Sequence, residues 1–108
     1  MEKFEAESIA EAGKNLPMRD IKYKVIENIK EFEKSCGCII VKNLDPDYSI
    51  LLGSLKLIIT EAGSPLAHLA IVGREQNIPI LLVEDIISKI PKTGKLSVKG
   101  NIVEVKEG

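Results

Sequence analysis

The chain has 108 residues, and its 15 lysines and arginines nearly balance its 16 aspartates and glutamates, giving a formal net charge of −1. This length suits a single domain. The balanced charge supplies no net field toward nucleic acid or an anionic membrane, so we expect neither as a partner.

The uncharged stretches exclude a spanning segment. The apolar stretches without a charge, such as 57–60 and 78–83, are far too short to cross a bilayer. The first residues, Met-Glu-Lys-Phe-Glu-Ala-Glu, lack the basic start and apolar run of a signal peptide. The sequence therefore predicts a cytoplasmic protein.

The beginning of the chain is rich in glutamate, alanine and lysine. This composition predicts a short helix over residues 1–15 that ends near Gly13. We treat residues 1–20 as a possible helical extension of a single domain that covers 1–108. The alternation of apolar and charged residues over 21–26 then predicts a half-buried strand.

From Asn28 onward, strands and short helices alternate. Helices are predicted from Asn28, as the cap, to about Lys34, over 48–52 after a turn and cap at Asp45-Pro46-Asp47, over 65–76 and over 84–90. Strands are predicted at 38–41, 55–60 and 78–83, and a closing hairpin at 95–98 and 102–105. A β-α-β-α-β order produces parallel strands with right-handed crossovers, so the expected fold class is α/β.

Cys36 and Cys38 are the two cysteines. A zinc site needs about four ligands, which a C-x-C pair and one distant histidine do not supply. Two residues apart on a strand, both thiols would point to one face as small hydrophobes. A redox or metal role stays open as the alternative.

His68, the one histidine, follows a strand end and a glycine-containing loop. The strand ends at Thr60 and the loop covers 61–64, so it lies at the carboxyl edge of the sheet, where binding sites gather in open α/β folds. Ser64 is a good N-cap and Pro65 suits the first helical position, which places His68 at the fourth.

Such a helix start offers free N–H donors. Ala67 stands where a capping box would have Glu or Gln, so no side-chain anion competes for them. The ring of His68 leans back toward these donors. A neutral imidazole is a nucleophile, and a phosphoryl group on it would carry about −1.5 to −2 charge. The residues alone leave two alternatives open: a phosphorylated histidine, and a histidine without chemistry at a helix start.

The residues around His68 have supporting roles in this prediction. Glu61 is the nearest carboxylate that could orient the ring. Arg74 lies about 240° around the helix from His68, so we expect it to point away and pair with an acidic neighbour. A sheet-facing stripe is predicted, made of Leu66, Leu69, Ala70 and Gly73.

The segment 63–75, Gly-Ser-Pro-Leu-Ala-His-Leu-Ala-Ile-Val-Gly-Arg-Glu, is followed by Asn-Ile-Pro at 77–79. It resembles the phosphohistidine signature of the phosphoenolpyruvate-utilising enzymes, a family that includes phosphoenolpyruvate synthase, pyruvate phosphate dikinase and enzyme I of the sugar phosphotransferase system. The likeness is specific from Thr60 to Ile80. It continues more weakly from Cys38 to the C-terminal hairpin.

This resemblance implies a stand-alone mobile domain of the swivelling β/β/α type, with a central, largely parallel sheet, flanking helices and a C-terminal hairpin. It implies that His68 carries the phosphoryl group. The phosphate-binding residues would be Thr60, Gly63, Ser64 and Ala67. In larger relatives such a domain moves between an ATP-grasp domain and a phosphoenolpyruvate/pyruvate-binding barrel.

The chain has no P-loop spacing of glycines. No cofactor or metal is therefore expected on the chain itself. Mg-ATP or phosphoenolpyruvate is expected on a separate partner that binds nucleotide, phosphoenolpyruvate or pyruvate. The leading hypothesis is a phosphoryl-transfer component in which His68 is transiently phosphorylated and passes the group to pyruvate or a similar acceptor.

Two positions depart from the family pattern. Ala67 replaces a frequent Thr or Ser, whose hydroxyl could bond the phosphate. Ala62 replaces a frequent glycine, so a turn with positive φ would be strained there. These departures favour the alternative of a non-catalytic module that docks to a dikinase-like partner. A small phosphocarrier with another acceptor is a third possibility.

Overall fold

The structure, a computed structural model, describes residues 2–10 and 17–106. Within them, eight strands form a single sheet in the order β1-β8-β7-β3-β4-β5-β6-β2. The strands are β1 (Glu2–Glu5), β2 (Glu7–Ala10), β3 (Met18–Val25), β4 (Cys38–Val41), β5 (Leu57–Thr60), β6 (Ile80–Leu82), β7 (Thr93–Lys99) and β8 (Ile102–Lys106).

Helical structure is sparse in the described residues. The described residues form one α-helix, α1 (His68–Glu75), and three 3-10 helices, η2 (Ile29–Glu31), η3 (Pro46–Ser54) and η4 (Ile87–Lys89). No helix in these parts of the chain is long and apolar enough to cross a membrane. The predicted caps are confirmed, since Asn28 accepts a bond from the Lys30 N–H and Asp45 from the Asp47 N–H.

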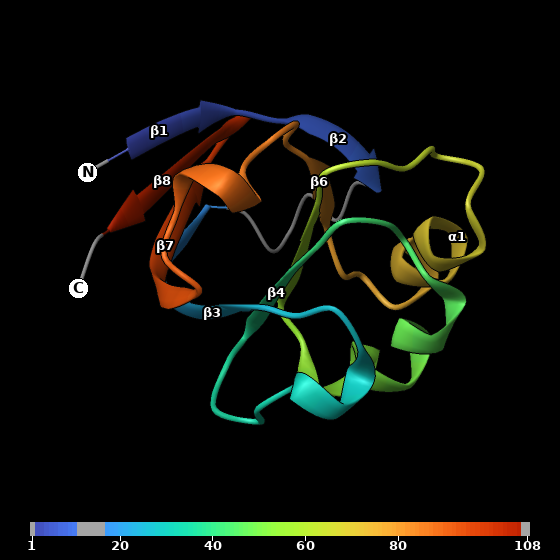
Figure 1. The fold of residues 1–108 in the computed structure, drawn as a ribbon. Helices are drawn as coiled ribbons and strands as arrows, with labels where there is room; N and C mark the ends of the chain where they lie inside the picture. The colour runs from blue at the N-terminus through green and yellow to red at the C-terminus, as the bar shows by residue number, and fades with distance from the viewer. Residues whose placement is uncertain (1, 11–16, 107–108) are drawn as a thin grey trace.

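The expected α/β fold, with a largely parallel sheet and flanking helices, is wrong. Strands β3, β4, β5 and β6 are parallel neighbours, as the alternating pattern predicts. The ends of the chain, however, add antiparallel pairings of β7 with β3, β8 with β7, β1 with β8 and β2 with β6. The result is a mixed sheet, curled into a nearly closed barrel, on which little helix is packed (Figure 1).

The N-terminal segment closes this barrel. β1 lies at one edge of the sheet and β2 at the other, and Ala6 alone joins them, so residues 2–10 run across from β8 to β6 (Figure 1). The buried Ala6 donates its N–H to the carbonyl of Asn101 at 2.7 Å. The helix predicted for 1–15 is therefore wrong over 2–10, and its end near Gly13 lies outside the described residues. Pairing at two open sheet edges outweighs the helix propensity of this stretch.

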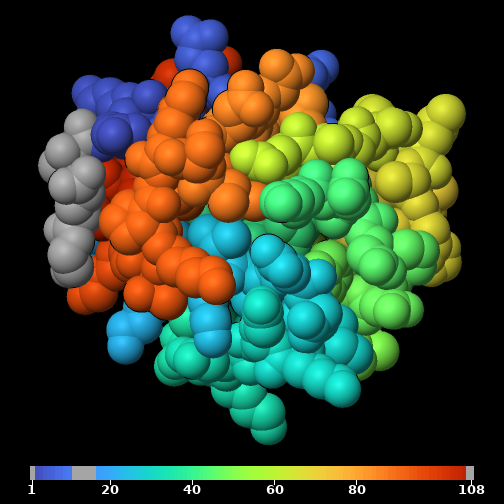
Figure 2. Space-filling model, in the orientation of Figure 1, coloured from blue at the N-terminus to red at the C-terminus, as the bar shows by residue number. Residues whose placement is uncertain are grey.

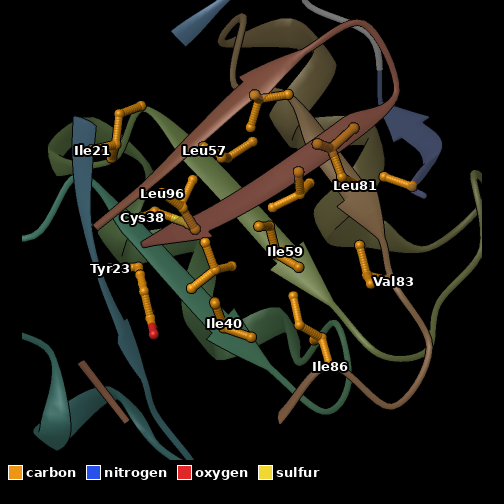
Figure 3. Close-up of a cluster of buried hydrophobic side chains, with 14 of the residues drawn as sticks. Ile21, Tyr23, Cys38, Ile40, Leu57, Ile59, Leu81, Val83, Ile86 and Leu96 are labelled. Atoms are coloured by element: carbon orange, nitrogen blue, oxygen red, sulfur yellow. The ribbon is translucent and has the colours of Figure 1, made fainter. Parts of the chain in front are cut away.

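The closed sheet is covered on both faces. Alternate residues of β4 and β5, including Cys38, Ile40 and Ile59, point into the barrel and form one core. Figure 3 shows this cluster, in which side chains from the central strands and the loop residue Ile86 meet. Residues between them in sequence, such as Ile39 and Ile58, pack outward against η3 and α1 in a second core. Strands buried on both faces explain the continuous apolar runs in the sequence.

Substitution of Ile9 in β2 tests whether the packing of this strand stabilises the closed barrel. Its side chain is 5% exposed and belongs to the outer core. We expect Ile9→Ala to lower the free energy of unfolding by about 2–5 kcal/mol, because it empties a packed position. Ser8→Ala on the same strand, at an exposed position, should change it by less than ~0.5 kcal/mol. Equal effects in chemical denaturation would contradict a packing role for β2.

Candidate functional site

The histidine segment is a β-turn followed by a helix, not one continuous helix. The Ser64 carbonyl accepts a bond from the Ala67 N–H at 3.0 Å, and Ser64 Oγ accepts one from the Leu66 N–H at 2.9 Å. The helix α1 begins only at His68, with Ala67 in the cap position and no side-chain cap. The prediction of Ser64 as N-cap and His68 at the fourth position is therefore wrong. Serine followed by proline is as typical of a turn start as of a helix start.

His68 is exposed at the first residue of α1. Behind it, Leu69, Ala70 and Gly73 are buried against the sheet, which confirms most of the predicted stripe. Leu66 does not belong to this stripe, since 84% of it is exposed in the turn. Figure 2 shows the segment around residues 61–70 (yellow-green to yellow) as a projecting corner of the molecule.

Thr60 and Glu61 anchor the start of the histidine loop. Thr60 is fully buried at the end of β5, and its hydroxyl donates to the Ala62 carbonyl at 2.7 Å. The Glu61 carboxylate accepts the Ile87 N–H at 2.9 Å. Glu61 therefore joins the loop to η4.

Arg74 anchors the other side of the loop. One guanidinium nitrogen donates to the Pro65 carbonyl at 2.8 Å and the other to the Ile9 carbonyl at 3.2 Å. The predicted pairing with an acidic neighbour is wrong, because the side chain bridges the histidine turn to β2. The sequence held no signal for this contact, which depends on the position of the N-terminal segment.

Glycine is required at the tight point of the loop. A Cβ on Gly63 would lie 2.7 Å from Leu44 Cδ1, and its φ is 158°. Ala62, in contrast, is not among the described non-glycine residues with positive φ. The backbone strain expected at Ala62 is therefore absent, and the alanine is compatible with the loop conformation.

The end of α1 explains the Asn-Ile-Pro part of the motif. Asn77 has φ of 60°, its N–H donates to the Arg74 carbonyl, and the Ile78 N–H donates to the Gly73 carbonyl. This is a Schellman arrangement, in which asparagine is the usual substitute for glycine. Gly73 also permits close approach to β6, since a Cβ there would lie 2.9 Å from Ile80 Cδ1.

Both cysteines are buried free thiols. Burial raises the pKa of the Cys38 thiol, which stands inside the barrel among apolar side chains. No group of three or more histidine, cysteine, aspartate or glutamate residues in the described part of the chain could hold a metal ion. These positions agree with the interpretation of the cysteines as small hydrophobes.

The geometry brings His68, Ser64 and Ala67 together on one exposed turn and helix start. Gly63 lies in the loop before them, and the Thr60 hydroxyl is buried in a bond within the same loop. The parts that sequence reasoning missed are Arg74, as the residue that bridges the turn to β2, and Leu66, as an exposed apolar side chain beside His68.

Comparison with known proteins found one matching family model and a similar solved structure. The family model of the PEP-utilising enzyme mobile domain matches residues 35–102, a range that includes β4, β5, α1, β6 and β7. A solution NMR structure of a UPF0107 protein is similar in fold, with a TM-score of 0.65 and 15% sequence identity over 98% of this chain and 100% of that chain. No curated protein sequence matches the chain.

Replacement of Arg74 should loosen the turn without unfolding the barrel. We expect Arg74→Gln to speed amide hydrogen exchange at Leu66 and Ala67 by about tenfold, because two charge-assisted bonds to carbonyls are lost. Exchange in β5 should stay unchanged. Glu75→Gln, the neighbouring exposed position, is the control and should leave both regions unchanged. Unaltered exchange in the turn of the Arg74 variant would show that the turn holds itself.

Proposed function

Because this chain belongs to the family of the mobile domains of PEP-utilising enzymes, we propose that it is a phosphoryl-transfer component whose carrier is His68. The observation that carries the proposal is the position of His68: it lies within the family match, exposed, at the start of α1. The donor, Mg-ATP or phosphoenolpyruvate, would be bound on a separate partner chain. Both donors are cytoplasmic metabolites, so the proposal includes a cytoplasmic location.

The proposed step is a displacement at phosphorus. A ring nitrogen of neutral His68 attacks the terminal phosphorus of the donor, an N–P bond forms, and the P–O bond to the leaving group breaks. With phosphoenolpyruvate, the electron pair goes to the enolate oxygen, and protonation yields pyruvate. In the reverse direction the phosphohistidine delivers the group to pyruvate or a similar acceptor.

The surroundings of His68 support a carrier. The first N–H groups of α1 have no partners within the helix, and a helix N-terminus stabilises an anion by roughly 0.3–1 kcal/mol. Ser64 and Gly63 lie just before this start and are the proposed phosphate neighbours. The bonds from Arg74 and to Glu61 hold the loop in position while the ring itself is exposed. A fixed loop reduces the entropy lost when the histidine meets its donor.

One observation favours the alternative of a non-catalytic docking module. Ala67, directly before His68, has no hydroxyl to bond a phosphate. It also holds the cap position of α1 without a side-chain bond. A module of this kind would keep the fold and bind its partner without being phosphorylated.

Phosphorylation of the purified chain separates these functions. The chain would be incubated with phosphoenolpyruvate, or with ATP and Mg²⁺, in an extract of its source cells, and separately with phosphoramidate as a chemical donor to histidine. We expect intact-mass spectra to show one acid-labile phosphoryl group. His68→Asn should abolish it, because the nucleophilic nitrogen is lost.

The outcomes are distinct. An adduct that persists in His68→Asn would assign the wrong residue. Labelling by phosphoramidate but by neither biological donor, under conditions that label a known family member, would contradict the transfer function and favour the docking module. Ala67→Thr should not remove the adduct, and faster labelling in this variant would indicate that the missing hydroxyl limits the reaction.

Exposed apolar residues beside His68 are proposed to meet the partner's donor site. Leu66 is 84% exposed in the turn, and Ile71, one helical turn after His68, is 42% exposed. We expect Leu66→Ser to lower the rate of labelling in extract by about tenfold, the effect of losing one buried leucine contact. Its melting temperature should not fall, because the side chain is exposed in the free chain.

Ile50→Ser is the matched control for this prediction. Ile50 is 71% exposed but lies in η3, outside the histidine turn. It should label at the rate of the unaltered chain. Equal rates for Leu66→Ser and the unaltered chain would exclude Leu66 from the contact.

A further inference from the structure

Two adjoining hollows lie at the amino ends of the parallel strands. Their volumes are about 560 Å³ and 440 Å³, and they share Arg19, Ile21 and Lys56 in their linings. The rest of the lining comes from the start of β3 and from the segments that precede β4, β5 and β6. Gln76 and Asn77, at the far end of α1, line the larger hollow. Since α1 rises 1.5 Å per residue, they lie roughly 12 Å along the helix from His68.

Four cations surround these hollows, namely Arg19, Lys22, Lys34 and Lys56, and all four are exposed. None of them forms a salt bridge with any residue in 2–10 or 17–106. Asp20 is the one carboxylate in the linings. It forms a salt bridge with Lys106, whose Nζ lies 2.6 Å from Asp20 Oδ1. The Asp20 carboxylate also acts on Arg19, so the four cations are offset by this one carboxylate alone among the lining residues, and the hollows keep an excess of positive charge.

The backbone of β3 bulges where one of these cations lies. The register of β3 against β7 shifts between Met18 and Ile21, and Asp20 has φ of 51°. The Asp20 N–H donates to Ser97 Oγ, and its carboxylate accepts from Lys106. A bulge of this kind re-aims side chains along a strand. Here Arg19, in the bulge, lines both hollows.

A second feature is unfavourable for stability alone. Lys22 on β3 lies directly opposite Lys95 on β7 in the antiparallel register. Like charges in such a cross-strand pair destabilise the sheet. The pair adds positive charge at the same end of the barrel. The Asp20 carboxylate offsets part of it at Lys95, and an anionic partner would lower the remaining repulsion.

The floor between the cations is apolar. Met18, Ile21, Leu55 and Ile78 line the larger hollow. A small inorganic anion would pair with the cations but would leave the apolar side chains without a contact. A polypeptide segment that carries both carboxylates and apolar side chains would use both, and two adjoining hollows give it the length to do so.

We propose that the paired hollows at the amino ends of β3–β6 are a docking surface for an acidic, partly apolar segment of a partner polypeptide, engaged by Arg19, Lys22, Lys34 and Lys56. This surface lies at the opposite end of α1 from His68. A partner bound there leaves the histidine turn exposed and able to react elsewhere. The proposal stands independently of whether His68 is phosphorylated.

The test is a titration of the ¹⁵N-labelled full chain with a short peptide that alternates glutamate and leucine. We expect amide shifts confined to residues 18–22, 34–37, 54–56 and 76–78. Binding should fall steeply between about 0.01 M and about 1 M salt, over which the screening length drops from ~30 Å to ~3 Å. The double variant Arg19→Glu/Lys56→Glu should weaken binding by about tenfold or more.

Matched controls decide the interpretation. Lys92→Glu/Lys99→Glu makes the same change of net charge at exposed positions outside the hollows, and it should leave the affinity within about twofold. A peptide with glutamine in place of glutamate should not bind. Equal weakening by both double variants, or shifts centred elsewhere, would overturn the proposal. Inorganic phosphate that reproduces the same shifts and displaces the peptide would make this a small-anion site and overturn the assignment to a polypeptide.

Both double variants should fold, because the substituted side chains are exposed. Thermal melts of the variants check this before the titration. If Arg19→Glu/Lys56→Glu melts early, Arg19→Gln/Lys34→Gln replaces it, since these changes only remove charge. Unchanged affinity in that second variant would also overturn the proposal.

Discussion

Closure of the sheet by residues 2–10 is the constraint on which the rest of the structure depends. β1 and β2 pair with strands at opposite edges, and Ala6 is the only residue between them. Because the two edges are tied by one continuous segment, the sheet curls and acquires an inside and an outside. The inner core fills the barrel, and the outer face receives α1 and η3.

The same closure positions the candidate site. β2 brings the Ile9 carbonyl within 3.2 Å of the Arg74 guanidinium, which also bonds to the Pro65 carbonyl. Ile9 Cδ1 would lie 3.4 Å from a Cβ on Gly63. The histidine turn is thus held by the N-terminal segment as well as by its own strand. A reactive side chain that is exposed on a fixed support can meet a partner's site with little loss of entropy.

The near-zero net charge of this protein conceals a local cluster of positive charge. The formal value of −1 excludes an overall attraction to anions. The fold nonetheless gathers Arg19, Lys22, Lys34 and Lys56 at the amino ends of the parallel strands, while Glu61 lies at their carboxyl ends. Sequence separation conceals this grouping, because three different segments contribute to it: β3, the segment before β4 and the segment before β5.

The sequence by itself determined the local features, because they depend on residues close together in the chain. Buried strands at β4, β5 and β6, the caps at Asn28 and Asp45, the helix end near Gln76 and the family motif around His68 were all readable from neighbouring residues. Tertiary structure alone decided the rest. A Glu- and Ala-rich start became two strands because open sheet edges were available to it. Ser64-Pro65 became a turn closed by bonds to Ser64, and Arg74 ties its Pro65 carbonyl to α1. Contacts between residues distant in sequence form the closed barrel, the Arg74 bridge and the cationic hollows, and packing leaves Leu66 exposed. No local pattern specifies such contacts.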